Sequence, residues 1–388
     1  SGLIDIGFGT LNAADQYWLP SISPLFSSVT LVAGIGVLIW SLGDRIGAPQ
    51  YIQLGSLILA GGTLSGGVLQ WLVQLIPQWK SGMGTLRLRF NWRIPGVTDV
   101  LKVMVPATLS SGMLHINVYT DLFFASYISG AAAAMRYANF IMLTPLGIIS
   151  NMILVPLMPV FARLAAPEHW GDLKLRIRQG LLLTALTMLP LTAIFISLAL
   201  PIVRVIYERY NFQSNASEFV APLLMAYGLG MFFYLGRDVL VRVFYALGDG
   251  ETPFRISILN ILLNAVLDYL LVKPLAAPGL VLATVSVNLT SMAIFLWILN
   301  RRLNGLPLGE WGLALLGLTG ATVVAGLGSW AANWGLSYLL GTNNLFLQLL
   351  QLVVSSSVAL GIFALLAMQL KLPEVDILAS RLRKKLSR

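Results

Sequence analysis

The sequence predicts an all-α polytopic membrane protein, and three observations support this fold class. Of the 388 residues, 57% are hydrophobic and only 11% are charged, whereas ordinary soluble domains carry about 25% charged residues. The mean hydropathy is +0.81. The apolar stretches are long enough for helices that cross a bilayer, and they are too long and too uniform for the alternating strands of a transmembrane barrel.

The apolar stretches predict one partial helix, which ends near Ala14, and ten full membrane-spanning helices. Their ends are placed to within about four residues. The full spans cover residues 24–42, 50–76, 100–126, 131–161, 181–207, 218–247, 253–272, 279–299, 311–332 and 345–370.

The distribution of Lys and Arg supports this number of spans. If the spans alternate in direction, the strongly basic segments fall on one side; these are 77–99, 162–180, 301–302 and 373–388. The opposite loops carry little positive charge, and 333–344 carries none. Because cytoplasmic loops are enriched in Lys and Arg, the C-terminus is expected in the cytoplasm. The net charge of +9 therefore indicates topology rather than binding to nucleic acid.

Some shorter features allow two interpretations. The segment 166–178 and the tail from Pro373 are basic, and each either lies along the membrane surface or is a solvated charged end. Gly62, Gly66 and Gly67 form a small-residue face that favours close helix packing, with a hinge as the alternative. Trp311 falls near a predicted membrane interface and is interpreted as a belt residue.

The stretch 240–272 carries an unusual set of polar residues. An apolar helix breaks at residues 248–250, and Pro253 stands where the next helix would begin. That helix is apolar except for Asn260, Asn264 and Asp268, which are four residues apart and so share one face. A carboxylate inside a membrane span costs free energy, so it points to a functional site.

Four stretches together resemble the MurJ (MviN) family of lipid II flippases, within the MOP superfamily of exporters. They are FYALGDGETP from Phe244, YANFIMLTPLGIISNMILVPLMPVFARL from Tyr137, INVYTDLFFAS from Ile116 and VIYERYNF from Val205. The resemblance implies a MOP-type two-lobed transporter with about eleven of fourteen family helices present, roughly the first three and a half being absent. It implies a remainder of the N-terminal lobe at 1–80, a second lobe at 100–302, two C-terminal helices at 311–370 and a basic cytoplasmic tail at 371–388.

The resemblance also implies a function. A protein of this kind, in the bacterial inner membrane, would move undecaprenyl-pyrophosphate-linked muropeptide (lipid II) to the outer leaflet by ion- or voltage-driven alternating access. The lipid tail would lie in a groove that involves the last two helices. The alternatives are another MOP exporter, such as a lipid-linked oligosaccharide flippase or a multidrug exporter, or an inactive fragment. We expect lipid II and membrane lipids as partners, a monomer, and no nucleic acid.

Enzyme chemistry is not expected. The sequence has no cysteine, no His-Glu-x-x-His motif and no phosphate-binding loop, and its two histidines, His115 and His169, are far apart. The absence of cysteine excludes disulfides and thiolate metal sites. His115 is interpreted as a packed, hydrogen-bonded residue rather than a proton carrier.

By resemblance, one set of residues matches a family sodium site. It would use the side chains of Asp121, Asn264, Asp268 and Thr284 and the carbonyl of Leu280. Hard cations take oxygen ligands of this kind, so Na⁺ is the expected coupling ion and no other cofactor is expected. The alternative is a set of separate polar contacts between helices.

Candidate substrate contacts lie near the start of the span 131–161. The family usually has an arginine at the position of Phe140, and here Arg136 lies one turn earlier on the same face. Arg136 is the candidate for the pyrophosphate, with Asn117 and Asn139 as further candidate substrate-binding residues. The alternative for Arg136 is an interfacial anchor whose charge reaches the lipid headgroups.

Overall fold

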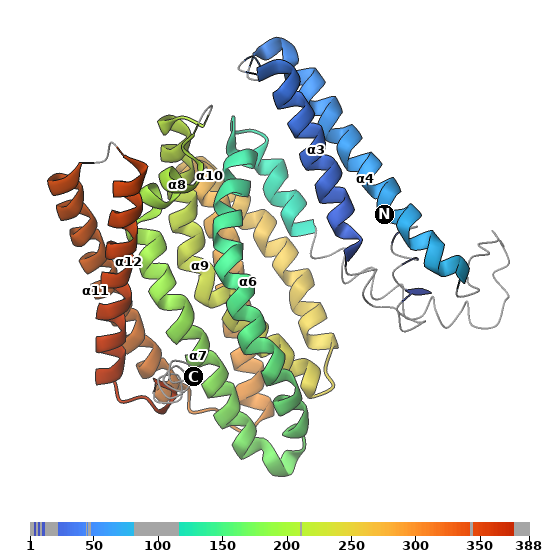
Figure 1. Ribbon diagram of the computed structural model, residues 1–388. Coiled ribbons are helices and arrows are strands. Elements are labelled where there is room, and N and C mark those ends of the chain that lie inside the picture. Colours follow the sequence, from blue (N-terminus) through green and yellow to red (C-terminus); the bar gives the residue numbers. More distant parts are fainter. Residues whose placement is uncertain are drawn as a thin grey trace, which may run out of the picture. The chain divides into compact units, whose positions relative to one another are not determined.

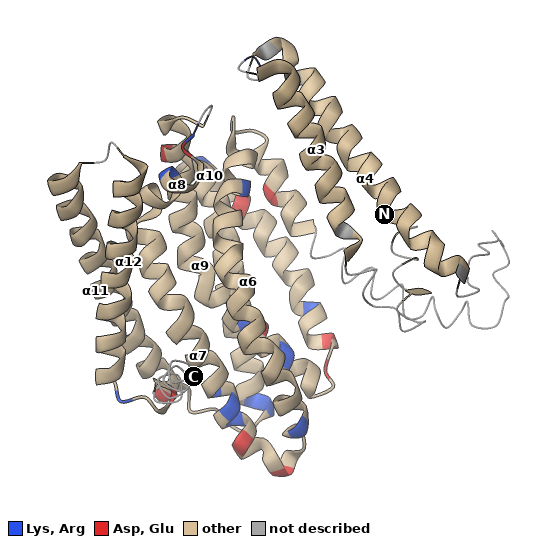
Figure 2. Ribbon diagram, viewed as in Figure 1, with Lys and Arg blue, Asp and Glu red and all other residues tan. Residues whose placement is uncertain are grey.

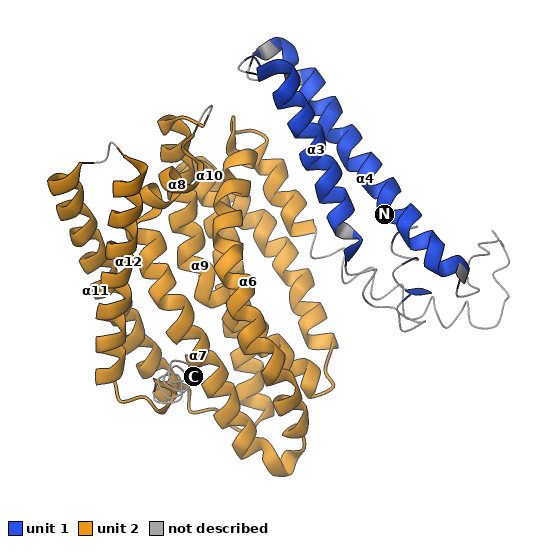
Figure 3. Ribbon diagram, in the orientation of Figure 1, with its two compact units in different colours: residues 1–100 blue, residues 101–388 orange. Residues whose placement is uncertain are grey.

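The computed structural model is helical throughout the part of the chain that it describes (Figure 1). It describes residues 4, 7, 10–11, 22–43, 45, 48–80, 116–209, 212–341 and 344–375. The chain divides into two compact units, residues 1–100 and 101–388 (Figure 3).

Unit 1 contains two long helices that pack against each other. They are α3 (Pro24–Leu42) and α4 (Ile52–Lys80), with the short 3₁₀ helix η2 (Pro49–Tyr51) before α4. A Cβ atom at Gly66 would collide with the Thr30 side chain and lie 2.6 Å from Ser27 Cα. The Thr30 hydroxyl also donates to the Gly62 carbonyl at 3.0 Å. The predicted close packing is therefore confirmed at Gly62 and Gly66, whereas Gly67 has no close contact with α3.

Unit 2 is a bundle around α9, which packs against four other helices. Residues 116–125 are helical and lead through a turn into α6. The other elements are α6 (Ala131–Arg163), η3 (Pro167–His169), α7 (Trp170–Ser197), α8 (Ala199–Tyr207), α9 (Ser214–Ala246), α10 (Glu251–Arg302), α11 (Leu308–Leu340) and α12 (Leu345–Gln369). Helix α11 packs on α7 and α12, so the last two helices belong to this unit.

Helix α10 contains two of the predicted spans. Its 52 residues are interrupted at Ala276, whose φ of 51° and ψ of −136° are not helical, between Pro274 and Pro278. The first arm (251–275) and the second arm (277–302) run antiparallel. Asn260 on the first arm accepts a hydrogen bond from Ser291 on the second, whereas Asn264, one turn later on the first arm, accepts one from Thr284, which is earlier on the second. Among the described residues, eight helices including α10 are long and apolar enough to cross a membrane. The predicted all-α membrane fold is confirmed.

Three sequence-based expectations need correction. Residues 170–178 are not a separate surface segment, because they form the first turns of α7 and bury Leu173 and Ile177 completely. The predicted span 181–207 is broken at Leu198, where α7 ends and α8 begins. Trp311 is only 4% exposed, so it packs inside unit 2 instead of forming part of a lipid-facing belt. Residues 376–388 lie outside the described chain.

Positive charge gathers at one end of unit 2, where α6 ends and α7 begins (Figure 2). Two contacts bring other segments to this basic end. Arg302 Nη1 lies 2.6 Å from Asp249 Oδ2, which joins the end of α10 to the turn before it. Arg178 Nε lies 3.7 Å from Glu374 Oε1, which joins the start of α7 to the segment after α12. Within the described residues, the basic segments 162–180 and 301–302 therefore lie at the same end of unit 2.

Candidate functional site

The five residues of the expected cation site come together in a polar cluster. Asp121 comes from the helical segment 116–125, Asn264 and Asp268 from the first arm of α10, and Leu280 and Thr284 from the second arm. The Asn264 amide nitrogen donates to Asp121 Oδ1 at 2.7 Å and to Asp268 Oδ2 at 2.9 Å. The Thr284 hydroxyl lies 3.2 Å from Asp121 Oδ2, 3.4 Å from Asn264 Oδ1 and 3.3 Å from the Leu280 carbonyl.

The cluster is buried, and one of its oxygens has no partner. Asn264 and Asp268 are 0% exposed, and Asp121 is partly buried. Asp268 Oδ1 is buried without a hydrogen-bond partner. An unpaired carboxylate oxygen in a low-dielectric interior costs several kcal/mol unless a ligand, proton or water satisfies it. The geometry therefore leaves coordination capacity at Asp268.

The donor set fits one small, hard cation. It offers two carboxylates and neutral oxygens from an amide, a hydroxyl and a carbonyl, which are ligands of alkali and alkaline-earth ions. No group of three His, Cys, Asp or Glu suited to a metal is present among the described residues. The Asn264 amide nitrogen now bridges the two carboxylates where a cation would lie, and rotation of the amide would instead direct Oδ1 at the ion.

A second layer of polar side chains supports the cluster. The Asn288 amide donates to the Thr284 carbonyl at 2.8 Å, and the Arg237 guanidinium of α9 donates to Asn288 Oδ1 at 2.9 Å. Sequence reasoning missed both residues, although signals were present. Asn288 follows Thr284 by four residues and so shares its face, and Arg237 is an ionisable residue inside a predicted span.

The candidate substrate contacts are not part of this hydrogen-bonded cluster. Arg136 is exposed on the second turn of α6. The ring of its neighbour Tyr137 packs at a tilt against the ring of Tyr207, with 4.9 Å between the centroids, and the backbone carbonyl of Tyr137 accepts a hydrogen bond from the Tyr207 hydroxyl. Since α6 runs from this turn to the basic end, Arg136 lies at the opposite end of unit 2.

The two asparagines differ in their surroundings. Asn117 lies one turn before Asp121 on the same helix, and its side-chain oxygen is buried without a partner. It therefore adjoins the polar cluster. Asn139 is partly buried on α6. His115 lies outside the described residues.

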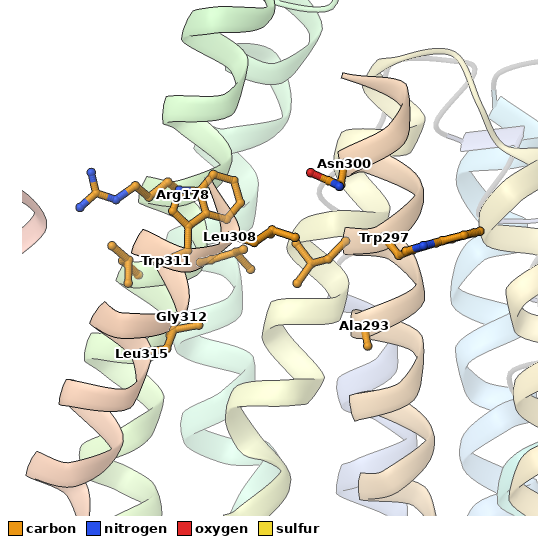
Figure 4. Close-up of a pocket in the computed structure, with 11 residues that line it drawn as sticks. Arg178, Ala293, Trp297, Asn300, Leu308, Trp311, Gly312 and Leu315 are labelled. Carbon is orange, nitrogen blue, oxygen red and sulfur yellow. The ribbon is translucent and has the colours of Figure 1, made fainter. Parts of the chain in front are cut away.

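An apolar cavity of about 340 Å³ lies between α7, the second arm of α10 and α11 (Figure 4). Figure 4 shows Leu308 and Trp311 beside the stem of Arg178, with Asn300 and Ala293 on the facing helix. The cavity lies at the basic end, beyond Thr284 and Asn288 along the second arm. Its lining suits hydrocarbon rather than a charged group.

Comparison with known proteins agrees with the resemblance in the sequence. The family described as "Lipid II flippase MurJ" matches residues 1–354. A relative from Synechocystis sp., named "Probable lipid II flippase MurJ", is 61% identical over all 388 residues, which span 73% of its length. A relative of the same name from Rhizobium tropici is 28% identical over 79% of this chain and 56% of its own.

The fold also has a solved counterpart. The structure titled "Lipid II flippase MurJ, inward closed conformation" superposes with a TM-score of 0.71 at 19% identity, covering 95% of this chain and 72% of the other. This likeness concerns the fold. The match over residues 1–354 and the 61% identity decide the family: this chain belongs to the MurJ family.

Proposed function

We propose that this protein is a lipid II flippase, which carries undecaprenyl-pyrophosphate-linked muropeptide from the cytoplasmic to the outer leaflet. The observation that carries the proposal is the family match over residues 1–354 together with 61% identity to the Synechocystis relative. The same match favours this substrate over those of other MOP exporters. Transport of this kind makes and breaks no covalent bond, so the proposal includes no enzymatic step.

The proposed orientation follows from the charge distribution. The basic end of unit 2 faces the cytoplasm by the positive-inside rule. The segment after α12 reaches that end through the contact between Arg178 and Glu374, so the C-terminus is cytoplasmic. Arg136 then lies towards the outer surface of a bacterial inner membrane.

The polar cluster is proposed to bind Na⁺ as the coupling ion. Asp121 belongs to a different helix from Asn264, Asp268 and Thr284, so an ion held by all of them ties three helical segments together. Such an ion stabilises the state in which these segments are close. An ion gradient can then favour one access state over the other, which supplies a direction for transport.

The substrate itself is proposed to contact two regions. Arg136 and Asn139, three residues apart on α6, offer a cation and an amide to the pyrophosphate and headgroup, since charge-assisted bonds to phosphate are strong. Asn117, whose side-chain oxygen has no partner, is proposed as a further substrate contact. The cavity between α7 and α11 is lined mainly by apolar side chains and is proposed to hold part of the lipid tail.

A chimera tests the function of this chain. The region of the Synechocystis relative that aligns with it is replaced by residues 1–388, and the chimera is expressed in a bacterium depleted of its own lipid II flippase. We expect growth and lipid II exposure at the outer surface to return to the level given by the intact relative. Normal insertion of the chimera without rescue, while the intact relative rescues, would overturn the proposal.

A further inference from the structure

We infer that Arg237 supplies a fixed positive charge that makes the polar cluster select a monovalent cation over a divalent one. The inference rests on the cation site proposed above and assigns a specificity-determining residue outside its ligand set. Arg237 lies on α9 and belongs to none of the segments that carry the five candidate ligands.

Direct contacts connect Arg237 to the cluster. The guanidinium Nη1 donates to Asn288 Oδ1 at 2.9 Å, and the Asn288 amide donates to the Thr284 carbonyl at 2.8 Å. The Thr284 hydroxyl then reaches Asp121 Oδ2 at 3.2 Å. Asn288 is only 3% exposed, so this chain of contacts runs through the interior of unit 2.

The packing of α9 against the second arm of α10 brings the guanidinium this close. A Cβ atom at Gly236 would lie 3.0 Å from the sulfur of Met292, so a small residue is needed where the two helices cross. The positive charge and the carboxylates therefore share one low-dielectric region.

The charges of this region then decide which ion fits. Asp121 and Asp268 contribute two negative charges, and Arg237 contributes one positive charge. The Asp238 carboxylate, next to Arg237 on α9, interacts with both Arg237 and Arg242, so Asp238 and Arg242 together add no net charge. One monovalent cation neutralises the single negative charge that remains. A divalent ion would instead leave an excess positive charge in the interior. Without Arg237, the two carboxylates match a divalent ion instead. A unit charge in a partly shielded interior changes ion affinity roughly tenfold.

Thermal unfolding of the purified full chain tests the inference. The midpoint is titrated with NaCl and with CaCl₂ against choline chloride at constant ionic strength, and apparent affinities are taken from the two curves. For Arg237→Gln we expect the ratio of Ca²⁺ to Na⁺ affinity to rise roughly tenfold, while Arg237→Lys keeps the wild-type ratio. Asn288→Asp, which adds a negative charge in place of a neutral amide, should raise the ratio in the same direction.

The control is Arg255→Gln, which removes one positive charge from the first arm of α10 at an exposed ion pair with Glu251. We expect this control to keep the wild-type ratio of Ca²⁺ to Na⁺ affinity. An unchanged ratio in both Arg237→Gln and Asn288→Asp, or an equal rise in the Arg255→Gln control, would overturn the role of Arg237. If Arg237→Gln does not fold, Asn288→Asp decides alone. Absence of any Na⁺-dependent shift in the wild type would instead refute the cation site itself.

Discussion

The amide nitrogen of Asn264 lies 2.7 Å from one oxygen of Asp121 and so joins α10 to a helix more than a hundred residues earlier in the chain. The same nitrogen donates to Asp268, so one neutral side chain bridges two carboxylates. Two carboxylates this close repel unless a proton, a donor or a cation lies between them. A bound cation would therefore take the place of the Asn264 amide donor between the two carboxylates and bring a full positive charge there.

Asp268→Asn and Asp121→Asn are expected to remove the stabilisation that Na⁺ gives to the purified protein. A ligand at about 100 times its Kd stabilises the folded state by about 2.7 kcal/mol, which is a shift of a few degrees in Tm. The measurement compares Tm in Na⁺ and in choline at equal ionic strength. Asp172→Asn, an exposed carboxylate at the start of α7, is the control and should keep the full shift. If both cluster variants keep it too, these residues are packing contacts only.

Much of the cluster could be predicted from helical spacing. Asn260, Asn264 and Asp268 share a face because they are four residues apart, and the structure buries all three. Leu280 and Thr284 follow the same rule on the second arm. The approach of Asp121 did not follow from spacing, because it depends on which helices are neighbours. Only the family resemblance placed it there.

Other features depend on tertiary packing that local sequence signals do not specify. The turn between the two arms of α10 places Ala276 at a φ of 51°, a conformation that usually calls for glycine. The break at Leu198 lies in a mainly apolar stretch, where the one local signal is Pro201, which has no N–H to donate to the Ser197 carbonyl. The contact of Arg237 with Asn288 requires α9 and the second arm to pack closely, which neither segment indicates alone.

Arg136→Ala is expected to abolish rescue by the chimera, and Arg136→Lys to retain part of it. The reason is that a pyrophosphate needs cationic partners, and lysine keeps the charge but loses the bidentate geometry of arginine. Growth of the depleted strain at matched expression is measured. The control is Arg176→Ala, which removes an exposed arginine at the basic end and should rescue normally. Full rescue by Arg136→Ala would assign Arg136 to anchoring at the membrane interface.

The contact between Asp249 and Arg302 is expected to make stability depend on acid pH. Burial acts to raise the pKa of Asp249, but the Thr252 backbone N–H and hydroxyl and the Arg302 guanidinium outweigh it and lower the pKa. A carboxyl whose pKa falls on folding stabilises the protein above its unfolded pKa, about 3.9. That contribution is lost as the pH falls through the lower, folded value.

The measurement is Tm against pH for the wild type and Asp249→Asn. The wild type should be more stable from pH 7 down to about pH 5, and the difference should shrink as the pH falls through about 4 and below. Glu251→Gln is the control, because Glu251 and its partner Arg255 are both more than 70% exposed and such pairs contribute little. If the difference in Tm between the wild type and Asp249→Asn stays constant from pH 7 to pH 3, the expectation is contradicted.

Filling the cavity between α7 and α11 is expected to block transport without unfolding the protein. Gly312 lines this cavity, and a Cβ atom there meets nothing within 4 Å, so Gly312→Phe would extend into the cavity without a backbone collision. If the cavity holds part of the lipid tail, the phenyl ring competes for the same volume. We expect at least a tenfold loss of rescue by the chimera, which corresponds to about 1.4 kcal/mol of lost binding.

The matched control is Gly320→Phe, two turns further along α11. Gly320 is exposed, and a Cβ atom there also meets nothing within 4 Å, but it does not line the cavity. Both substitutions add the same apolar volume and remove one helical glycine, so their effects on helix stability should be similar. Rescue by Gly320→Phe together with loss in Gly312→Phe, at equal membrane levels and equal Tm, supports a tail in the cavity. Equal rescue by both variants would exclude it.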